Sequence, residues 1–132
     1  MCLLLLLPAG LTAQHQLVVD VSGVQSSDGY IQVALYNQKE AFLKTEGVYR
    51  NDSTRAHEGV TRLAFDDLPP GNYALAVFHD TNANYHLDTN WVGIPKEPMG
   101  FSNARMKMFG PPSFEECLVE LKGNTAIAVE IK

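Results

Sequence analysis

Short runs in which apolar and polar residues alternate recur along this chain, and Gly, Pro, Asn or Asp bounds most of them. An alternation with a period of two is typical of a β-strand that buries one face, whereas an amphipathic helix repeats every 3.6 residues. Only residues 39–44 suit a helix, and they suffice for a single turn. The pattern predicts strands at residues 16–24, 30–36, 60–65, 72–79, 116–122 and 125–131.

Turn residues between these runs predict how the strands connect. Asp28-Gly29 predicts a hairpin between the first two strands, and Gly123-Asn124 predicts another between the last two. Residues 46–59 are polar and are predicted to form a loop. Both faces of residues 72–79 are apolar, which predicts a central strand that is covered on both sides.

The chain has 132 residues, which suits one hydrophobic core. About seven strands without a long helix predict an all-β fold, a single antiparallel β-sandwich of immunoglobulin-like type over residues 14–132. Residues 80–114 combine Asn, Pro and Gly with several aromatic side chains. This composition predicts one long ordered loop, because a disordered segment would carry few aromatic residues.

Residues 1–13 hold five consecutive leucines, Pro8 and small residues, with no charge. They predict a signal peptide that is cleaved after Ala13, and the missing basic start indicates that the full leader begins further upstream. A buried N-terminal strand is the alternative. The apolar run is shorter than the roughly 20 residues that cross a bilayer, so no transmembrane segment is expected in the mature chain. The mature protein is expected to be periplasmic, attached to the cell surface or secreted.

The net charge bears on possible partners, and the cysteine content bears on thiol chemistry. A formal net charge of -5 provides no basic field, so nucleic acid is not an expected partner. Once the leader and Cys2 are removed, Cys117 is the single thiol of the chain. The alternation around Cys117 predicts an inert cysteine in a buried strand.

Oxygen-bearing side chains follow one another at every second position after residue 79, which is the pattern of a calcium loop. Calcium takes six to eight oxygen ligands, from carboxylates, amides and a backbone carbonyl. Tyr85 stands where such a loop usually has Gly, and Trp91 where it has Glu, so the pattern predicts a weak site for millimolar extracellular calcium. The candidate ligands are Asp80, Asn82, Asn84, the carbonyl of His86, Asp88, and Glu97 as a carboxylate that folds back.

Other interpretations of the same segment stay open. Asn and Asp readily accept hydrogen bonds from their own backbone, so the residues could simply cap turns. His79 and His86 bracket the segment and could hold zinc or copper. A hydrolase for a small polar substrate could use His79, His86 and Asp80, although no serine stands in a recognisable nucleophile context; Ser102 and Ser113 are the candidates.

Aromatic side chains in the long loop allow two interpretations. They could line a groove for a sugar or a peptide, or they could pin the loop onto the sheet. The residues concerned are Trp91, Phe101, Phe109 and Phe114.

Several ordered blocks of the sequence resemble the domain-of-unknown-function family 2141, a group of small exported bacterial proteins. The resemblance spans the predicted mature chain and implies a β-sandwich similar to transthyretin-like and carboxypeptidase-regulatory-like domains. It brings no catalytic residues, which favours a non-catalytic binding or structural module whose partner is a cell-surface protein or a glycan. Family members usually carry Gly within the Asp-x-Asn-x-Asn segment, where this chain has Ala83 and Tyr85. The blocks are Leu-Pro-Pro-Gly-Asn-Tyr-Ala (68–74), Val-Phe-His-Asp-Thr-Asn (77–82), Leu-Asp-Thr-Asn (87–90), Gly-Ile-Pro-Lys-Glu (93–97), Gly-Phe-Ser-Asn (100–103) and Gly-Pro-Pro-Ser-Phe (110–114).

Overall fold

The computed structural model describes residues 14–86 and 96–132, so the predicted signal peptide at residues 1–13 lies outside the described residues. Strands dominate, and the described residues hold only two helical turns, both of the 3-10 type. The predicted all-β class is confirmed. The elements are β1 (His15–Val24), β2 (Tyr30–Tyr36), η1 (Lys39–Ala41), η2 (Thr45–Gly47), β3 (Arg50–Arg55), β4 (Gly59–Leu68), β5 (Gly71–Asp80), β6 (Met99–Phe101), β7 (Val119–Leu121) and β8 (Thr125–Glu130).

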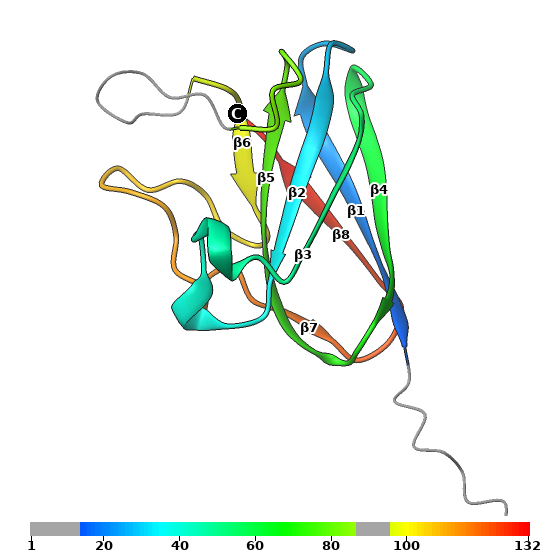
Figure 1. Cartoon of the computed structure of the whole chain (residues 1–132), viewed down its shortest axis with the longest axis vertical. Coiled ribbons are helices and arrows are strands. Elements are labelled where there is room, and N and C mark those ends of the chain that lie inside the picture. Colours follow the sequence, from blue (N-terminus) through cyan, green and yellow to red (C-terminus); the bar gives the residue numbers. More distant parts are fainter. Residues whose placement is uncertain (1–13, 87–95) are drawn as a thin grey trace, which may run out of the picture.

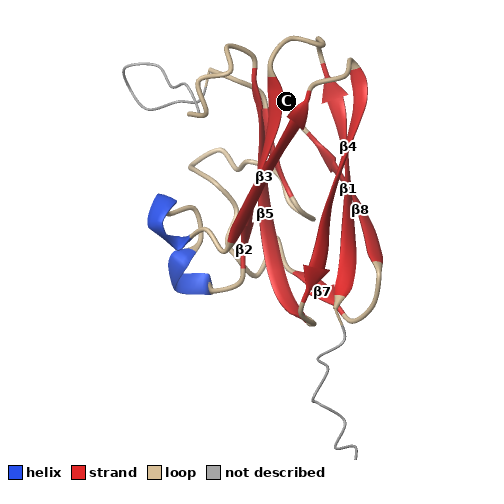
Figure 2. Ribbon diagram, turned by 45° about the vertical axis from the view of Figure 1, so that its right-hand side comes forward, coloured by secondary structure: helices blue, strands red, loops and turns tan. Residues whose placement is uncertain are grey.

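The strands form two sheets (Figures 1 and 2). A three-stranded sheet has the order β4-β1-β8, and a five-stranded sheet has the order β3-β2-β5-β6 with β7 also paired to β5. Most pairs are antiparallel, but β8 runs parallel to β1, from Leu17 opposite Thr125 to Ser22 opposite Glu130. The predicted purely antiparallel pairing is therefore wrong for this pair.

Both predicted hairpins are wrong. β1 and β2 lie in different sheets, because β4 and β8 occupy the two edges of β1. β7 and β8 are also separated, since β7 pairs with β5 and β8 pairs with β1. Turn residues determine that the chain reverses, but they do not determine whether the next strand joins the same sheet.

Two other predictions concern single strands of the larger sheet. The predicted loop at residues 46–59 contains β3, which pairs with β2 along its whole length. β3 is an edge strand whose residues are all at least partly exposed, so it forms through backbone hydrogen bonds without an apolar face. The predicted central strand is confirmed, because β5 has β2 on one side and β6 and β7 on the other.

One main core lies between the sheets, and side chains of both contribute to it: Leu17, Val19 and Val21 of β1 meet a cluster that includes Val33, Leu35, Leu75 and Val77 of the larger sheet. A second, smaller cluster, here called the satellite cluster, forms around Ala74, Phe101 and Cys117, with Phe42 and Phe114 packed against it. Ala74 alternates with the inward-facing Tyr73 and Leu75, so the satellite cluster lies on the outer face of the five-stranded sheet. The helical turns also lie on this side in both views (Figures 1 and 2).

The two sheets are joined along one seam, where β6 meets the end of β8. Met99 and Lys132 exchange two backbone hydrogen bonds, each of 3.1 Å. Gly100 makes this approach possible, because a Cβ atom there would lie 2.4 Å from the carbonyl oxygen of Glu130. The residue therefore has to be glycine for the sheets to meet.

Cys117 is fully buried, as predicted, but it lies in a turn before β7 and not in a strand. Its backbone N–H points to the carbonyl oxygens of Ser113 and Phe114, which holds the turn against the sheet. Burial raises the pKa of the Cys117 thiol to about 11. The thiol therefore stays protonated and unreactive at neutral pH. None of the described helices is long and apolar enough to span a bilayer.

Candidate functional site

Asp80 ends β5 and holds the start of the predicted calcium segment. Its side chain is fully buried. One carboxylate oxygen accepts the backbone N–H of Asn84 at 3.1 Å, and the other accepts the N–H of Tyr85 at 2.7 Å and the side-chain amide of Gln32 at 3.2 Å. Asp80 thus ties the segment both to itself and to the neighbouring strand β2.

The two asparagines of the segment build successive turns. The side-chain oxygen of Asn82 accepts the N–H of Asn84 at 3.3 Å, and that of Asn84 accepts the N–H of His86 at 2.9 Å. These are the hydrogen bonds that the turn-capping interpretation predicts. Both asparagines are exposed, whereas Asp80, to which the N–H of Asn84 also donates, is buried.

Two non-glycine residues of the segment have a left-handed backbone. The φ angle is +56° at Ala83 and +64° at Tyr85. Tyr85 is the sixth residue of the calcium pattern, the position that normally requires Gly for this conformation. Tyr85 adopts this left-handed conformation although its Cβ atom crowds the backbone there, which costs about 1–2 kcal/mol. The Tyr85 ring stacks on Tyr30 of β2, with 6.4 Å between the ring centroids.

Glu97 folds back onto the start of the segment. Its side chain is buried, and one carboxylate oxygen accepts the backbone N–H of Thr81 at 2.9 Å and the Thr81 hydroxyl at 3.4 Å. Two buried carboxylates, those of Asp80 and Glu97, are thereby brought to the base of one segment. The candidate ligand Asp88 lies outside the described residues.

The histidines do not form a transition-metal site in the described part of the chain, where no three His, Cys, Asp or Glu side chains gather. His79 points into the core and is 1% exposed, whereas His86 is exposed. The His79 Nε2–H donates to the carbonyl oxygen of Asp28 at 2.6 Å. Its buried Nδ1 has no hydrogen-bond partner among the described residues.

Both candidate serine nucleophiles have structural contacts. Ser102 is fully buried; its hydroxyl donates to the Cys117 carbonyl at 2.6 Å and accepts the Leu75 N–H at 3.0 Å. Ser113 caps the following turn, where its hydroxyl accepts the N–H of Glu116 at 3.2 Å. None of the hydrogen bonds found for these serines within residues 14–86 and 96–132 involves a histidine. Because His79 is also buried, the proposed hydrolase residues are not gathered on one accessible surface.

The sequence matches the model of a family described as an uncharacterized protein conserved in bacteria (DUF2141), over residues 19–128. The match runs from β1 into β8 and covers most of the chain. The chain belongs to this family. No curated protein and no solved structure gave a match.

In this DUF2141 protein the predicted aromatic residues divide into two groups. Phe101 is buried and Phe114 packs on the satellite cluster, as expected for side chains that pin a loop to a sheet. Phe109 is 98% exposed, so the pinning interpretation is wrong for this residue. It belongs to residues 103–111, here called the arm, which follow β6. Trp91 lies outside the described residues.

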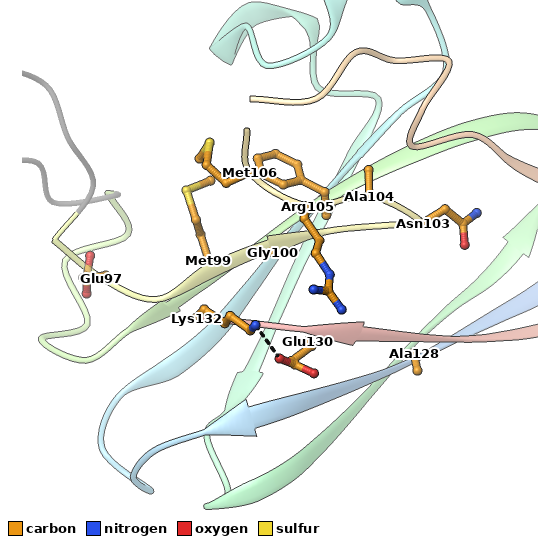
Figure 3. A pocket seen from close by; sticks show the side chains of 11 residues that line it. Glu97, Met99, Gly100, Asn103, Ala104, Arg105, Met106, Ala128, Glu130 and Lys132 are labelled. Carbon is orange, nitrogen blue, oxygen red and sulfur yellow. Dashed lines mark ion pairs between the residues drawn. The ribbon is translucent and has the colours of Figure 1, made fainter. Parts of the chain in front are cut away.

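Two hollows border the arm, and the larger one is lined by Phe101 and Phe109, two of the four aromatic residues for which the sequence left a groove open as one interpretation. A groove of about 920 Å³ lies over the outer face of the five-stranded sheet, with Ala34, Ala76 and Phe78 among its lining residues. A smaller hollow of about 530 Å³ lies at the seam between β6 and β8. Figure 3 shows Arg105 extending there from the arm, toward β8 where Lys132 pairs with Glu130 at 3.4 Å. Both hollows are lined by methionines: Met99 and Met106 line both of them, and Met108 lines the groove.

Proposed function

We propose that this DUF2141 protein is an exported, non-catalytic module whose segment from Asp80 to Glu97 binds a structural calcium ion. We further propose that the two sheets form a β-sandwich of transthyretin or immunoglobulin type, which is supported by the single core between them. The leader-like pattern of residues 1–13 supports export. The structural contacts of Ser102, Ser113 and His79 support a non-catalytic role.

The observation that carries the calcium proposal is the buried carboxylate of Asp80. All the hydrogen-bond donors that reach it in the described chain are neutral amides, and no Lys or Arg of residues 14–86 and 96–132 pairs with it. A buried charge without a counter-charge is costly. Calcium, when bound, would supply that counter-charge.

The chemistry of the surrounding residues fits a hard divalent cation. Glu97 brings a second carboxylate to the same place, and the amide oxygens of Asn82 and Asn84 are of the type that calcium prefers. The left-handed backbone at Tyr85 gives the segment the turn that calcium loops require at this position. The proposed role of the calcium ion is to hold the connection between β5 and β6 in one conformation.

Calorimetry and thermal unfolding of residues 14–132 test the proposal. A calcium ion that binds only the folded state at ten times its Kd stabilises the protein by about 1.4 kcal/mol, which raises the Tm by roughly 5 °C. Asp80→Asn keeps the size of the side chain but removes its charge, so the calcium response should disappear. Glu58→Gln is the matched control, because Glu58 is an exposed acid in the connection between β3 and β4.

The expected result is heat of binding near one ion per chain and a Tm that rises with calcium and falls with chelator. Glu97→Gln should weaken the response, and Glu58→Gln should leave it unchanged. No heat and identical melting curves up to 10 mM calcium, a concentration above the usual range of extracellular sites, would overturn the proposal. The segment would then be a set of capped turns.

A further inference from the structure

The outer face of the five-stranded sheet carries small and apolar side chains where a solvent-facing sheet normally carries polar ones. Ala34 of β2 lies directly opposite Ala76 of β5, and Ala76 in turn lies opposite Phe101 of β6. The satellite cluster covers one part of this face. The groove of about 920 Å³ lies over the adjoining part and shares Ala76, Met99 and Phe101 with the satellite cluster. The two facing alanines carry small side chains, which leaves space over the sheet there.

Exposed hydrophobic residues concentrate around this groove. Seven large hydrophobic residues are exposed in the described part of the chain, and all but Tyr49 and Val60 line the groove. Concentrations of exposed apolar surface usually mark binding sites, and methionine side chains adapt to the shape of a ligand. The five that line the groove are Leu43, Tyr85, Met106, Met108 and Phe109.

The arm forms one wall of the groove through a tight turn. Lys107 and Gly110 exchange two backbone hydrogen bonds, of 2.8 and 3.3 Å. The turn leaves Met108 91% exposed and Phe109 98% exposed at its tip. Both side chains line the groove, so a molecule bound there would cover apolar surface that is now in contact with water.

The Asp, Glu, His, Lys or Arg side chains that line the groove in the described chain are all basic. The chain holds 15 Asp and Glu against 10 Lys and Arg, yet none of the groove residues that the structure describes is acidic. The ionisable basic side chains among them are Lys107 and His86. Lys107 is held in place by an ion pair with Glu116, which lies outside the groove lining. This arrangement is complementary to an apolar molecule with an acidic head.

We propose that the groove binds a free amphipathic anion, of the class of long-chain carboxylic acids, with its apolar chain over Ala34 and Ala76 and its head group at Lys107. The volume lies within the roughly 300–1,000 Å³ that small-molecule sites occupy, which favours a single molecule over a bilayer surface. A sugar would require more polar groups than this mainly apolar lining offers. The inference goes beyond the calcium proposal, since the floor and Lys107 lie outside residues 80–97.

Calorimetric titration of residues 14–132 with dodecanoate, below its micellar concentration, tests this inference. Dodecanol and dodecyltrimethylammonium have the same chain with a neutral or a cationic head, and they separate the contribution of charge from that of the apolar chain. Dodecanoate should bind more tightly than dodecanol, and the ammonium compound should bind most weakly. Equal binding of all three compounds, or no binding of dodecanoate, would overturn the proposal.

Single substitutions in the groove test where dodecanoate binds. Ala34→Leu fills the floor and should weaken dodecanoate by roughly tenfold, because the chain loses the burial of a few methylene groups. Lys107→Gln removes the charged donor and should weaken dodecanoate by about tenfold while leaving dodecanol unchanged. Lys122→Gln is the matched control: Lys122 forms a similar exposed ion pair, with Glu120, but does not line the groove.

Glu116→Gln tests the role of the existing ion pair. Loss of Glu116 removes the competing carboxylate from Lys107, so dodecanoate should bind a few-fold more tightly. The melting curve of each variant shows whether it still folds. Phe109→Ala removes an apolar side chain at a 98% exposed position, so it should fold normally and bind dodecanoate more weakly. Binding to neutral phosphatidylcholine vesicles without binding of dodecanoate would overturn the proposal in favour of a membrane surface.

Discussion

On the three-stranded sheet, the outward side chains Asp20 of β1 and Arg62 of β4 face each other across the strands and form an ion pair. On the five-stranded sheet, the corresponding outward positions of β2 and β5 hold Ala34 and Ala76, which also face each other. Both sheets bury a similar inner face in the common core. The difference shows that the larger sheet needs a second cover, whereas the smaller one can meet water directly.

The chain supplies part of that second cover. The turn before β7 lays Cys117 and Phe114 against the sheet, and Phe42 packs edge-on against Phe114 at 5.9 Å between ring centroids. The arm covers the remaining part only loosely, because its Met108 and Phe109 are almost fully exposed. The outer face is thus closed at one end and open at the other, which is where we place a ligand.

The largest effect is expected at the seam that joins the two sheets. A Gly100→Ala substitution would place a Cβ atom 2.4 Å from the Glu130 carbonyl oxygen and 3.0 Å from a methyl group of Val129. Because these neighbours belong to β8, the strands would have to separate, and we expect a loss of about 3 kcal/mol in the free energy of unfolding. Urea unfolding measures this loss, and hydrogen exchange at Met99 and Lys132 reports the seam itself.

Gly123→Ala is the control for this experiment, since no atom lies within 4 Å of the added Cβ. Its effect should stay below about 1 kcal/mol. Equal losses in the free energy of unfolding for the two substitutions would show that the seam does not hold the three-stranded and five-stranded sheets together.

A smaller effect is expected from opening the covered end of the apolar face. Phe114→Ala removes a partly buried ring from the satellite cluster and should cost about 2 kcal/mol, less than a fully buried phenylalanine. It should also expose Cys117 to Ellman's reagent. The buried thiol, with its pKa raised to about 11, should not react at pH 8 in the native protein. Phe109→Ala should change neither stability nor labelling, and rapid labelling of native Cys117 would show that the satellite cluster is not closed.

The smallest effect is expected on the polar face. The hydrogen bond from Arg62 and its charge lower the pKa of Asp20. A lowered carboxyl pKa stabilises the folded protein above about pH 4, and this contribution is lost as the pH falls through the pKa of the folded state. Because the pair is exposed and screened by salt, Arg62→Gln should leave the Tm unchanged within error.

Carbon-13 detected titration of the Asp20 carboxyl measures the pair directly. The pKa of Asp20 should rise toward its ordinary value in Arg62→Gln, and a smaller rise should follow the addition of 1 M salt to the native protein. An Asp20 pKa that does not respond to either change would show that the ion pair is not formed in solution.

The sequence predicted those strands whose side chains alternate, because alternation is a local property. β1, β2 and β4 have this pattern, β5 was predicted from a short run that is apolar on both faces, and all four lie close to their predicted bounds. β3 has no apolar face, and its pairing with β2 depends on backbone groups that carry no sequence signal. The hairpins failed for a similar reason, since the partner of a strand is chosen by residues far away in the sequence.

Part of the candidate site could also be predicted from the sequence, and part could not. The spacing of Asp80, Asn82 and Asn84 predicted a set of oxygen atoms within one short segment, and the structure places them there. Neighbouring residues of a strand point to opposite faces, but the sequence analysis did not indicate which of His79 and Asp80 faces the core. In the structure His79 points into the core and Asp80 points to the opposite face. The aromatic residues of the long loop left a groove open as one interpretation, but its place on the sheet was not predictable, because that requires knowing that Ala34 and Ala76 face each other.

The parallel pairing of β1 with β8 has a consequence for the order of folding. β8 is made more than 100 residues after β1, so the central strand of the smaller sheet lacks one partner until residues 125–130 have been synthesised. Contacts between such distant segments form slowly, because a long loop must close before they are made. The nascent chain therefore remains without its complete core during synthesis.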